Sequence, residues 1–560
     1  MDLCQNEFRR QLLDILDQIS DATFVTIDLE MSGIATRHKN SSNDRSLDLA
    51  KPTLQQQYEE VKSAAETYQM LQMGITIVKE EREKDFYIAR PYNFNVSPLS
   101  SSGVDIGLQR IIRFSSSACD FLLKNGFDFG KVFRAGIPYL SRDEEAELTL
   151  ENNQRAERTS KIPDLLIKAE DTPALEFYNT TRQTIKNWVE KPKQNFANIG
   201  GETEKLSGFQ RRLVYQLIRN EFPDLRAFSR CDGDFMQVEK INIEREAEYK
   251  VSRLQKFNTK VAKQKGLGWI FEALCGGDLS GIDPLWSYNL EDTEPEKQPD
   301  GIALRIKNLN TKLRSKNHVI VGHNIFMDLA FLYKTFIGSL PLLVEDFQDA
   351  IHNVFPSIID TKYLATHGLE STTTRSSLKD LLDPLRKIQN PLILLHQDHR
   401  AYGSNFGRDH EAGYDSWMTA ELFVKLSASI CSSNKLTSPI AASESRSQAN
   451  SDTSRLNSVG FPSSDNSEAS SHEATESLLG PKNTLTAQEL STGSKAQNTL
   501  VYSNPYAILE DVEDRERLSE TGQASCNQWL PEFSSDFWKI YSNKLRVNAI
   551  ESGICDLPSR

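Results

Sequence analysis

Asp28 and Glu30, in the run FVTIDLEM at 24–31, are the pair whose types and spacing most directly indicate chemistry. They lie at the end of an apolar stretch that predicts a buried strand. Because strand side chains alternate between faces, both carboxylates point to the same side. Two neighbouring acids repel each other, and a hard divalent cation with oxygen ligands relieves that repulsion. The pair therefore indicates a metal site, provided that other segments supply further ligands.

A second segment with candidate ligands is HVIVGHNIFMDLAFLYKTF at 318–336, which predicts a strand, a sharp turn and a helix. Asp328 falls in the first turn of that helix, facing the end of the strand. A carboxylate there also stabilises the helix through its dipole, so a structural role stays open beside a metal-binding one. Asn324, in the turn, either caps the helix or contacts a ligand.

The third segment, HEAGYDSWMTAELF at 410–423, predicts the start of another helix. His410 and Asp415 are five residues apart, about a turn and a half. One side chain can therefore lie on the rim while the other points inward. Most single histidines are structural, but one beside a group of carboxylates can accept a proton from water at neutral pH.

Together these segments predict a two-metal centre. Two Mg²⁺ ions roughly 3.5–4 Å apart can hold a phosphodiester from both sides, with histidine as the general base. A zinc site would more often use His or Cys ligands, and the chain offers no suitable set. The candidate ligands are Asp28, Glu30, Asp328 and Asp415, with His410 beside the last of them.

The composition is that of a folded protein with a polar tail. At 560 residues the chain can form two or three domains. With 65 Lys and Arg against 78 Asp and Glu, the net charge is −13, which argues against a nonspecific nucleic-acid coat but allows a local basic groove. The seven cysteines lack CxxC spacing, so a reducing compartment fits best. No apolar run is long enough to span a bilayer, so no membrane association is expected.

The order of helix and strand patterns along the chain predicts one α/β domain that is interrupted by a smaller domain. Helix and strand patterns alternate over 1–160 and again over 263–430, beginning with an amphipathic helix that places Phe8, Leu12 and Leu16 in the core. The block 161–262 is rich in Lys and Arg. Residues 431–525 are Ser-rich and predicted to be disordered. The aromatic segment 526–560 is expected to dock on the folded body; a separate binding peptide is the alternative.

The three motifs carry a family resemblance. DLE at 28–30, HNIFMD at 323–328 and HEAGYD at 410–415 occur in the order of the DEDDh 3′–5′ exonucleases. GFDFGKVFRAGIPYL at 126–140, GFQRRLVYQ at 208–216 and FPSIIDTK at 355–362 resemble the poly(A)-specific ribonuclease (PARN) family. The resemblance implies an RNase H-like mixed sheet with flanking helices, interrupted by a small inserted α/β nucleic-acid-binding domain. It also implies Mg²⁺ dependence, release of 5′-mononucleotides from single-stranded 3′ poly(A), and a homodimer.

The resemblance also assigns roles by position. Asp28, Glu30, Asp328 and Asp415 match the family's metal-binding acids and His410 its general base. Ile34, Asn324 and Lys362 match residues that contact the terminal nucleotides, although a solvated role for Lys362 is equally compatible with the sequence. Asp360 is interpreted as a supporting or structural acid, because four acids already complete the set.

Two departures from the family pattern affect RNA binding. The inserted domain is named in the family for an Arg-x-x-x-His motif, and here Arg211 is followed by Tyr215. Arg211, Arg212 and Arg219 could follow phosphates while Tyr215 stacks a base; alternatively, the arginines form a solvated face. In the vertebrate enzyme an RNA-recognition module after the nuclease contributes cap binding; the corresponding stretch here is of low complexity and shows no aromatic-rich ribonucleoprotein motif, so cap stimulation is not expected.

The leading hypothesis is a 3′–5′ exoribonuclease that shortens poly(A) or trims RNA 3′ ends, in the nucleus, the cytoplasm or both. A small-RNA trimmer with little poly(A) preference is the enzyme alternative, and a DNA exonuclease fits less well. The non-enzyme alternative is an inactive RNA-binding scaffold. Degenerate relatives usually lose one of the acids, and all are present here.

Overall fold

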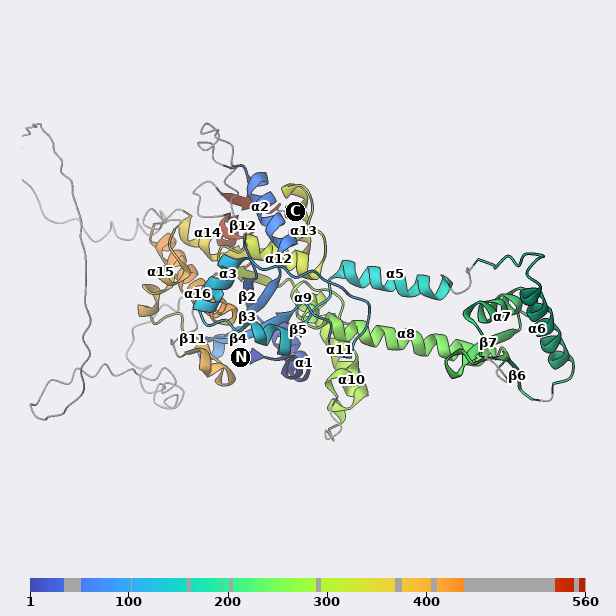
Figure 1. Cartoon of the computed structure of the whole chain (residues 1–560). Coiled ribbons are helices and arrows are strands. Elements are labelled where there is room, and N and C mark those ends of the chain that lie inside the picture. Colours follow the sequence, from blue (N-terminus) through green and yellow to red (C-terminus); the bar gives the residue numbers. More distant parts are fainter. Residues whose placement is uncertain are drawn as a thin grey trace, which may run out of the picture. The chain divides into compact units, whose positions relative to one another are not determined.

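The computed structural model describes residues 1–34, 52–101, 103–158, 163–192, 194–200, 205–288, 294–367, 375–403, 410–437, 529–547 and 553–558 (Figure 1). No helix within these ranges is both long and apolar enough to cross a bilayer. The predicted Ser-rich tract at 431–525 lies outside them from residue 438 on. Its first residues continue helix α16, which ends at Thr437 and so passes the predicted boundary at 430.

A mixed β-sheet forms the centre of the body (Figure 1). Its strands, in spatial order, are β1 (Asp2–Leu3), β4 (Phe86–Ser97), β3 (Met70–Glu81), β2 (Phe24–Met31), β9 (Val319–Gly322) and β10 (Ser357–Asp360). Strands β2, β3 and β4 are antiparallel, whereas β9 is parallel to β2 and β10 is parallel to β9. Short strands β5 (Ile137–Pro138) and β11 (Ile393–Leu395) pair with β4. The prediction of an RNase H-like mixed sheet is confirmed.

The two faces of this sheet carry different side chains. On β2, Val25, Ile27 and Leu29 point into the main hydrophobic core. That core also receives side chains from α1 (Gln5–Asp21), α9 (Gly268–Leu274), α11 (Pro299–Arg314), α12 (Phe326–Phe336) and α13 (Val344–Val354). The predicted core face of α1 is confirmed, since its apolar stripe is fully buried. The opposite face of β2, which carries the two acids, meets α16 (Ala412–Thr437).

Residues 163–242 contain a second, smaller core. The three-stranded antiparallel sheet is ordered β6 (Phe196–Ile199), β8 (Phe235–Lys240), β7 (Leu225–Arg230), and α6 (Thr172–Glu190) and α7 (Gly208–Glu221) pack against it. Helices α5 (Arg142–Arg158) and α8 (Ile243–Lys265) flank the segment in the sequence. Its cluster includes Ile185, Val214 and Met236.

The C-terminal residues pack onto the body. Trp529 meets Tyr87 edge to face at 5.2 Å, and Trp538 lies 5.5 Å from Phe423 on α16. Beyond α19 (Asp536–Tyr541), the hairpin of β12 (Lys544–Arg546) and β13 (Ile554–Asp556) sends Leu545 into the main core. This segment therefore contributes core residues of its own.

The remaining elements are short, apart from α2. They are α2 (Leu54–Thr67), α3 (Ser116–Lys124), α4 (Phe129–Ala135), α10 (Pro284–Ser287), α14 (Thr361–Thr366) and α15 (Leu378–Leu382), with 3₁₀ turns η2 (Arg82–Lys84), η3 (Cys231–Gly233), η4 (Pro295–Lys297), η5 (Leu385–Lys387) and η6 (Gln397–Gly403).

Candidate active site

Strand β2 places the first two acids. Asp28 pairs in register with Gly74 of β3, and Glu30 pairs with Gln72. The register shifts directly after Glu30, so the acids occupy the last regular positions of the strand. Both side chains stay partly accessible to solvent. As predicted from strand alternation, they lie on one face.

A close backbone approach brings the start of α16 to this face. A side chain on Gly74 would place its Cβ 1.9 Å from the carbonyl oxygen of Ala412, so only glycine allows the contact. The backbone N–H of Gly413 donates to Asn93 Oδ1 at 3.2 Å, and that of Ala412 reaches Gln72 Oε1 at 3.4 Å. Polar strand side chains thereby satisfy part of the helix start.

Threonines fix the same helix one residue beyond Asp415. Thr26 Oγ1 on β2 donates to the carbonyl oxygen of Ser416 at 2.7 Å, and the hydroxyls of Thr76 and Ser416 are 2.9 Å apart. All three residues are fully buried. Asp415 is therefore held from the strand that carries Asp28.

Glu30, His410 and Asp415 converge at the end of β2. One ligand atom from each lies within 4.8 Å of the other two. Burial is the largest cause that raises the pKa of Asp28 well above its ordinary value, followed by the charges of Asp415, Asp328 and Glu30. The pKa of Glu30 is raised by burial and then by the charges of Asp415 and Asp328. The structure thus brings all four predicted acids into one electrostatic group.

Asp328 joins the group from the first turn of α12, as predicted. Burial and, to a smaller extent, the charge of Asp360 raise its pKa to about 7, although backbone hydrogen bonds lower it. An acid at the positive end of a helix would normally have a lowered pKa. Burial therefore outweighs the dipole, and the carboxyl is poised to lose its proton near neutral pH.

His410 lies on the exposed rim of the group, with φ = +67°, two residues before α16 begins at Ala412. Its ring meets Phe121 of α3 edge to face, with centroids 4.7 Å apart. His323, by contrast, is 2.9 Å from Thr361 Oγ1, and burial followed by the charge of Lys362 lowers its pKa to about 3. Of these two histidines, His410 has the position and exposure that a general base needs.

Asp360 is a buried acid whose carboxylate accepts hydrogen bonds from three segments next to the site. Its Oδ1 accepts the backbone N–H of Asn324 at 2.8 Å and of Lys362 at 2.9 Å. Its Oδ2 accepts the backbone N–H of Arg546 at 2.8 Å. Burial raises its pKa to about 6 although these hydrogen bonds lower it. One carboxylate therefore connects the turn before Asp328, the start of α14 and the C-terminal hairpin, in keeping with a supporting role.

The three predicted nucleotide contacts lie in different environments. Ile34 is 48% exposed, at the end of a described range. Asn324 has φ = +57° and donates its N–H to Asp360; it does not cap α12, whose N-cap residue is Ile325. The Lys362 ammonium donates to the carbonyl of Ser376, and burial lowers its pKa. Their roles with RNA stay predictions.

The arginines of α7 in the inserted segment are engaged with the protein. Arg212 donates to the carbonyl of Pro163 at 3.0 Å, and Arg219 forms an ion pair with Asp164. Arg211 lies over Gly233, where an added Cβ would meet its guanidinium. Tyr215 is 44% exposed. The role of these residues with RNA stays a prediction.

The donor set of the site fits divalent metal ions. Carboxylate oxygens dominate it, with one imidazole at the rim, and such hard oxygen donors suit Mg²⁺ or Mn²⁺. The mutual repulsion that raises the pKa of Asp28 is the kind that a bound cation relieves. The residues that would hold the ions are the four acids.

Sequence reasoning missed three contributors to the site. Gly74 could be suspected from the polar and small residues that alternate in QMGITI at 72–77. The contact of Phe121 with His410 had no sequence signal. Arg546 supports Asp360 through its backbone N–H, and a backbone atom leaves no trace in residue type.

Known proteins resemble the chain over most of its length. The CAF1 family ribonuclease model matches residues 4–423. The poly(A)-specific ribonuclease PARN of Danio rerio is 24% identical over 433 residues, covering 76% of this chain and 59% of that protein. The Pre-piRNA 3′-exonuclease trimmer of Bombyx mori is 27% identical over 444 residues, covering 76% and 71%. The chain thus spans about three fifths of the length of the PARN relative.

A solved structure of Pop2p from S. pombe, in its Mg²⁺- and Mn²⁺-bound form, matches with a TM-score of 0.32 and 12% identity. The match covers 75% of this chain and 89% of that one.

Proposed function

The chain belongs to the CAF1 family of ribonucleases, and from that premise we propose that it is a 3′–5′ exoribonuclease dependent on two Mg²⁺ ions. One observation carries the proposal. Four acids from three distant segments share one electrostatic group, and His410 lies at its exposed rim within reach of Glu30 and Asp415.

The chain's own residues supply positioning and proton transfer. The four acids would hold the ions, whose positive charge favours ionisation of the attacking water and offsets charge on the leaving 3′ oxygen. His410 accepts the proton of that water, and the edge contact with Phe121 restricts its ring. Water oxygen would bond to the phosphorus of the last phosphodiester, and the bond from that phosphorus to the 3′ oxygen of the preceding nucleotide would break. The last nucleotide would leave with a 5′-phosphate, and the 3′ oxygen would take up a proton and stay on the shortened RNA as a hydroxyl.

The proposed substrate is a single-stranded RNA 3′ end, preferably poly(A). The PARN relative supports the poly(A) preference through its name, and the trimmer relative supports the alternative of 3′-end trimming. The test is a digestion ladder of a 3′ A-tailed RNA, a mixed-sequence RNA and the matching DNA, with 5′-AMP measured as product. Faster loss of the A-tail supports deadenylation, and equal RNA rates support a trimmer. Internal cleavage, or equal turnover of DNA, would contradict the proposal.

The family resemblance also supports a homodimer located in the nucleus, the cytoplasm or both. Light scattering on the purified chain of 63.4 kDa would give twice that mass for a dimer. Cell fractionation tests the location. A strictly monomeric active protein would contradict the dimer.

A further inference from the structure

A groove of about 550 Å³ lies along α8, at some remove in the sequence from the acids. One wall is the α8 face that carries Tyr249, Arg253, Lys256 and Lys260. The other walls come from α5 and from the loop at Asp105–Gly107. We infer that this α8 groove binds single-stranded RNA upstream of the 3′ end, an inference that rests on the proposed function.

The charge of α8 changes sharply along its length. From Tyr249 to its last residue the helix carries no Asp or Glu. The same stretch carries six cations, which are Lys250, Arg253, Lys256, Lys260, Lys263 and Lys265. The protein as a whole has a net charge of −13. A cationic stripe on an acidic protein attracts a polyanion locally.

Two of the groove cations are available for a ligand. Arg253 and Lys256 are exposed, and in the described part of the chain neither makes a hydrogen bond or an ion pair. Lys260 is tethered, since its ammonium donates to the carbonyl of Asp105 at 3.1 Å. The carboxylate of Asp105 faces its own loop and accepts the N–H of Gly107, while Glu151 is the acid on the α5 wall.

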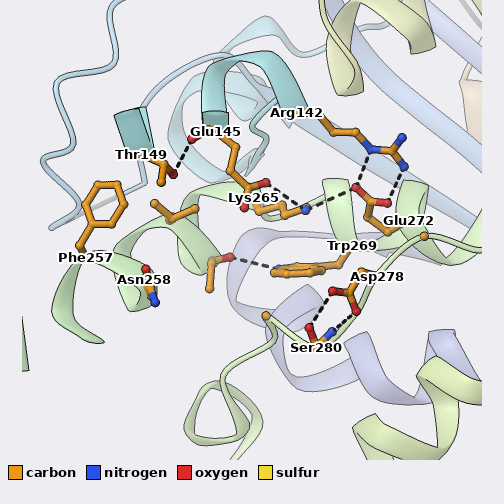
Figure 2. A pocket seen from close by; sticks show the side chains of 14 residues that line it. Arg142, Glu145, Thr149, Phe257, Asn258, Lys265, Trp269, Glu272, Asp278 and Ser280 are labelled. Carbon is orange, nitrogen blue, oxygen red and sulfur yellow. Dashed lines mark hydrogen bonds and ion pairs between the residues drawn. The ribbon is translucent and has the colours of Figure 1, made fainter. Parts of the chain in front are cut away.

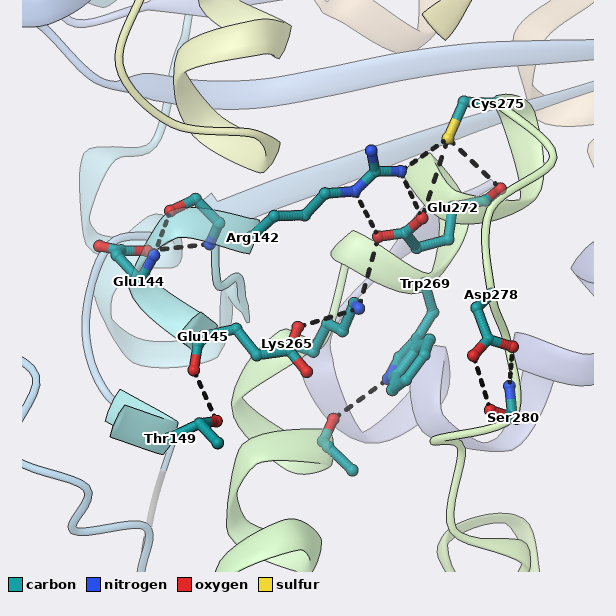
Figure 3. Close-up of polar contacts among 12 residues, drawn as sticks. Arg142, Glu144, Glu145, Thr149, Lys265, Trp269, Glu272, Cys275, Asp278 and Ser280 are labelled. Atoms are coloured by element: carbon teal, nitrogen blue, oxygen red, sulfur yellow. Dashed lines mark hydrogen bonds and ion pairs between the residues drawn. The ribbon is translucent and has the colours of Figure 1, made fainter. Parts of the chain in front are cut away.

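In a neighbouring cavity, the Lys and Arg side chains are paired with acids of the protein. The cavity, of about 530 Å³, is drawn in Figure 2. Arg142 forms a bidentate ion pair with Glu272. Lys265 pairs with Glu145 and Glu272 and lies over the Trp269 ring (Figure 3). These cations are neutralised by the protein, whereas Arg253 and Lys256 are not.

Tyr249 adds a feature that a purely electrostatic patch lacks. Its side chain is 64% exposed and lies one helical turn from Arg253. An exposed aromatic ring beside unpaired cations can stack a base while the cations contact phosphates. This combination favours single-stranded RNA over an acidic protein as the occupant.

The chain also connects the groove to the acids. The segment from Gly107 leads to Ser115, whose N–H donates to the carbonyl of Ser32, two residues beyond Glu30. Eight residues span at most about 28 Å at roughly 3.5 Å each. An RNA strand whose 3′ end lies at the acids could therefore reach the groove within about that distance.

The first test measures binding without turnover. The full chain is titrated with labelled oligo(A) of about 20 nucleotides in EDTA, a length sufficient for a site of the usual size. Arg253→Gln with Lys256→Gln should weaken binding at least tenfold. It should also reduce the slope of log K against log salt by about 1.4, because each lost phosphate contact on a single strand is worth about 0.7. Arg10→Gln with Lys307→Gln is the matched control, since both residues are exposed cations on other helices, α1 and α11, and do not line the groove.

The second test separates base stacking from charge. Tyr249→Ala should weaken binding of the same oligonucleotide at least about fivefold, and Tyr249→Phe, which keeps the ring, should restore it. Melting curves of all variants report whether the fold is retained, because these side chains are exposed.

The outcomes distinguish this inference from the proposed function. If wild-type protein binds RNA through the groove but cleaves none, the proposed nuclease function is contradicted and the inference about the groove is supported. Active protein whose groove variants bind as tightly as wild type, or no more weakly than the control variant, overturns the groove. Displacement of RNA by poly(glutamate) at equal charge concentration would also overturn it, because the site would then favour an acidic protein.

Discussion

At the scale of single residues, the carboxyl groups lie close together, as a bound cation would require. This arrangement lowers the stability of the metal-free protein. Asp28, Glu30 and Asp328 all have raised pKa values, with burial as the largest cause. The charges of neighbouring acids add to it, mainly those of Asp415 and Asp328 at the strand acids and that of Asp360 at Asp328. Groups that hold protons more tightly when folded lose stabilisation as pH rises. The group of acids therefore destabilises the metal-free fold at neutral pH, and the proposed metal ions would remove that destabilisation.

A pH dependence of stability follows. The pKa of Asp328 is about 7 in the folded state, against an ordinary value of about 4 in the unfolded chain. The folded state therefore binds more protons between those values, and in EDTA the melting temperature should fall as pH rises from about 4 to 7. Addition of Mg²⁺ should recover the loss at pH 7.5 and have little effect at pH 5. A metal-free melting temperature that rises over this window would contradict the pKa directions.

Asp328→Asn should separate stability from activity. The amide keeps the shape of the carboxyl but removes one buried like charge, so the metal-free protein should melt at a higher temperature at pH 7.5 than wild type. Turnover should fall by at least about a hundredfold, because a ligand for the ions is lost. Thermal scans in EDTA and product release in Mg²⁺ measure the two effects. A variant that is both less stable and fully active would be incompatible with this account.

At the scale of elements, the site depends on how closely α16 approaches β3. Gly74→Ala would direct a methyl group at the Ala412 backbone, where no side chain can yield. Overpacking of this kind typically costs about 1–3 kcal/mol, and here it moves the helix that carries Asp415. We expect lower stability together with a larger loss of kcat. Gly208→Ala, at the start of α7 with only ordinary contacts, is the control and should have little effect.

The hairpin of β12 and β13 supports the site through a backbone atom. Arg546→Pro removes the N–H that Asp360 Oδ2 accepts, a charge-assisted bond whose loss costs about 1.5–3 kcal/mol. Arg546→Ala keeps that N–H and loses side-chain contacts, among them those of the guanidinium with Thr366 and Tyr363. The proline variant should lose clearly more activity and should exchange the Asn324 amide hydrogen faster. Equal effects of the two variants would contradict a role for the backbone bond.

At the scale of the whole molecule, local patterns predicted the segments that carry the four acids, and tertiary contacts explain what those patterns missed. Strand alternation was enough to place Asp28 and Glu30 on one face, and helix-start signals placed Asp328 in a first turn. The Gly74 contact joins segments more than 300 residues apart in sequence, and no local pattern encodes it. The same holds for Arg546, whose contribution is independent of its side chain.

The C-terminal segment shows the same limit. Its aromatic residues indicated that it would dock, but composition could not show that Leu545 enters the main core or that its hairpin reaches Asp360. More than 90 residues separate the end of α16 from Trp529. Residues on both sides of this long segment therefore contribute to the same core.

The most direct test of the central claim is the release of 5′-AMP from the 3′ end of oligo(A) by the purified full chain in Mg²⁺. Wild-type protein should release it one nucleotide at a time, EDTA should stop the release, and Asp28→Ala and His410→Ala should each reduce it by at least about a hundredfold. Both variants should still bind the oligonucleotide. Release that persists at the wild-type rate in either variant would contradict the assignment of the carboxylate group as the catalytic centre.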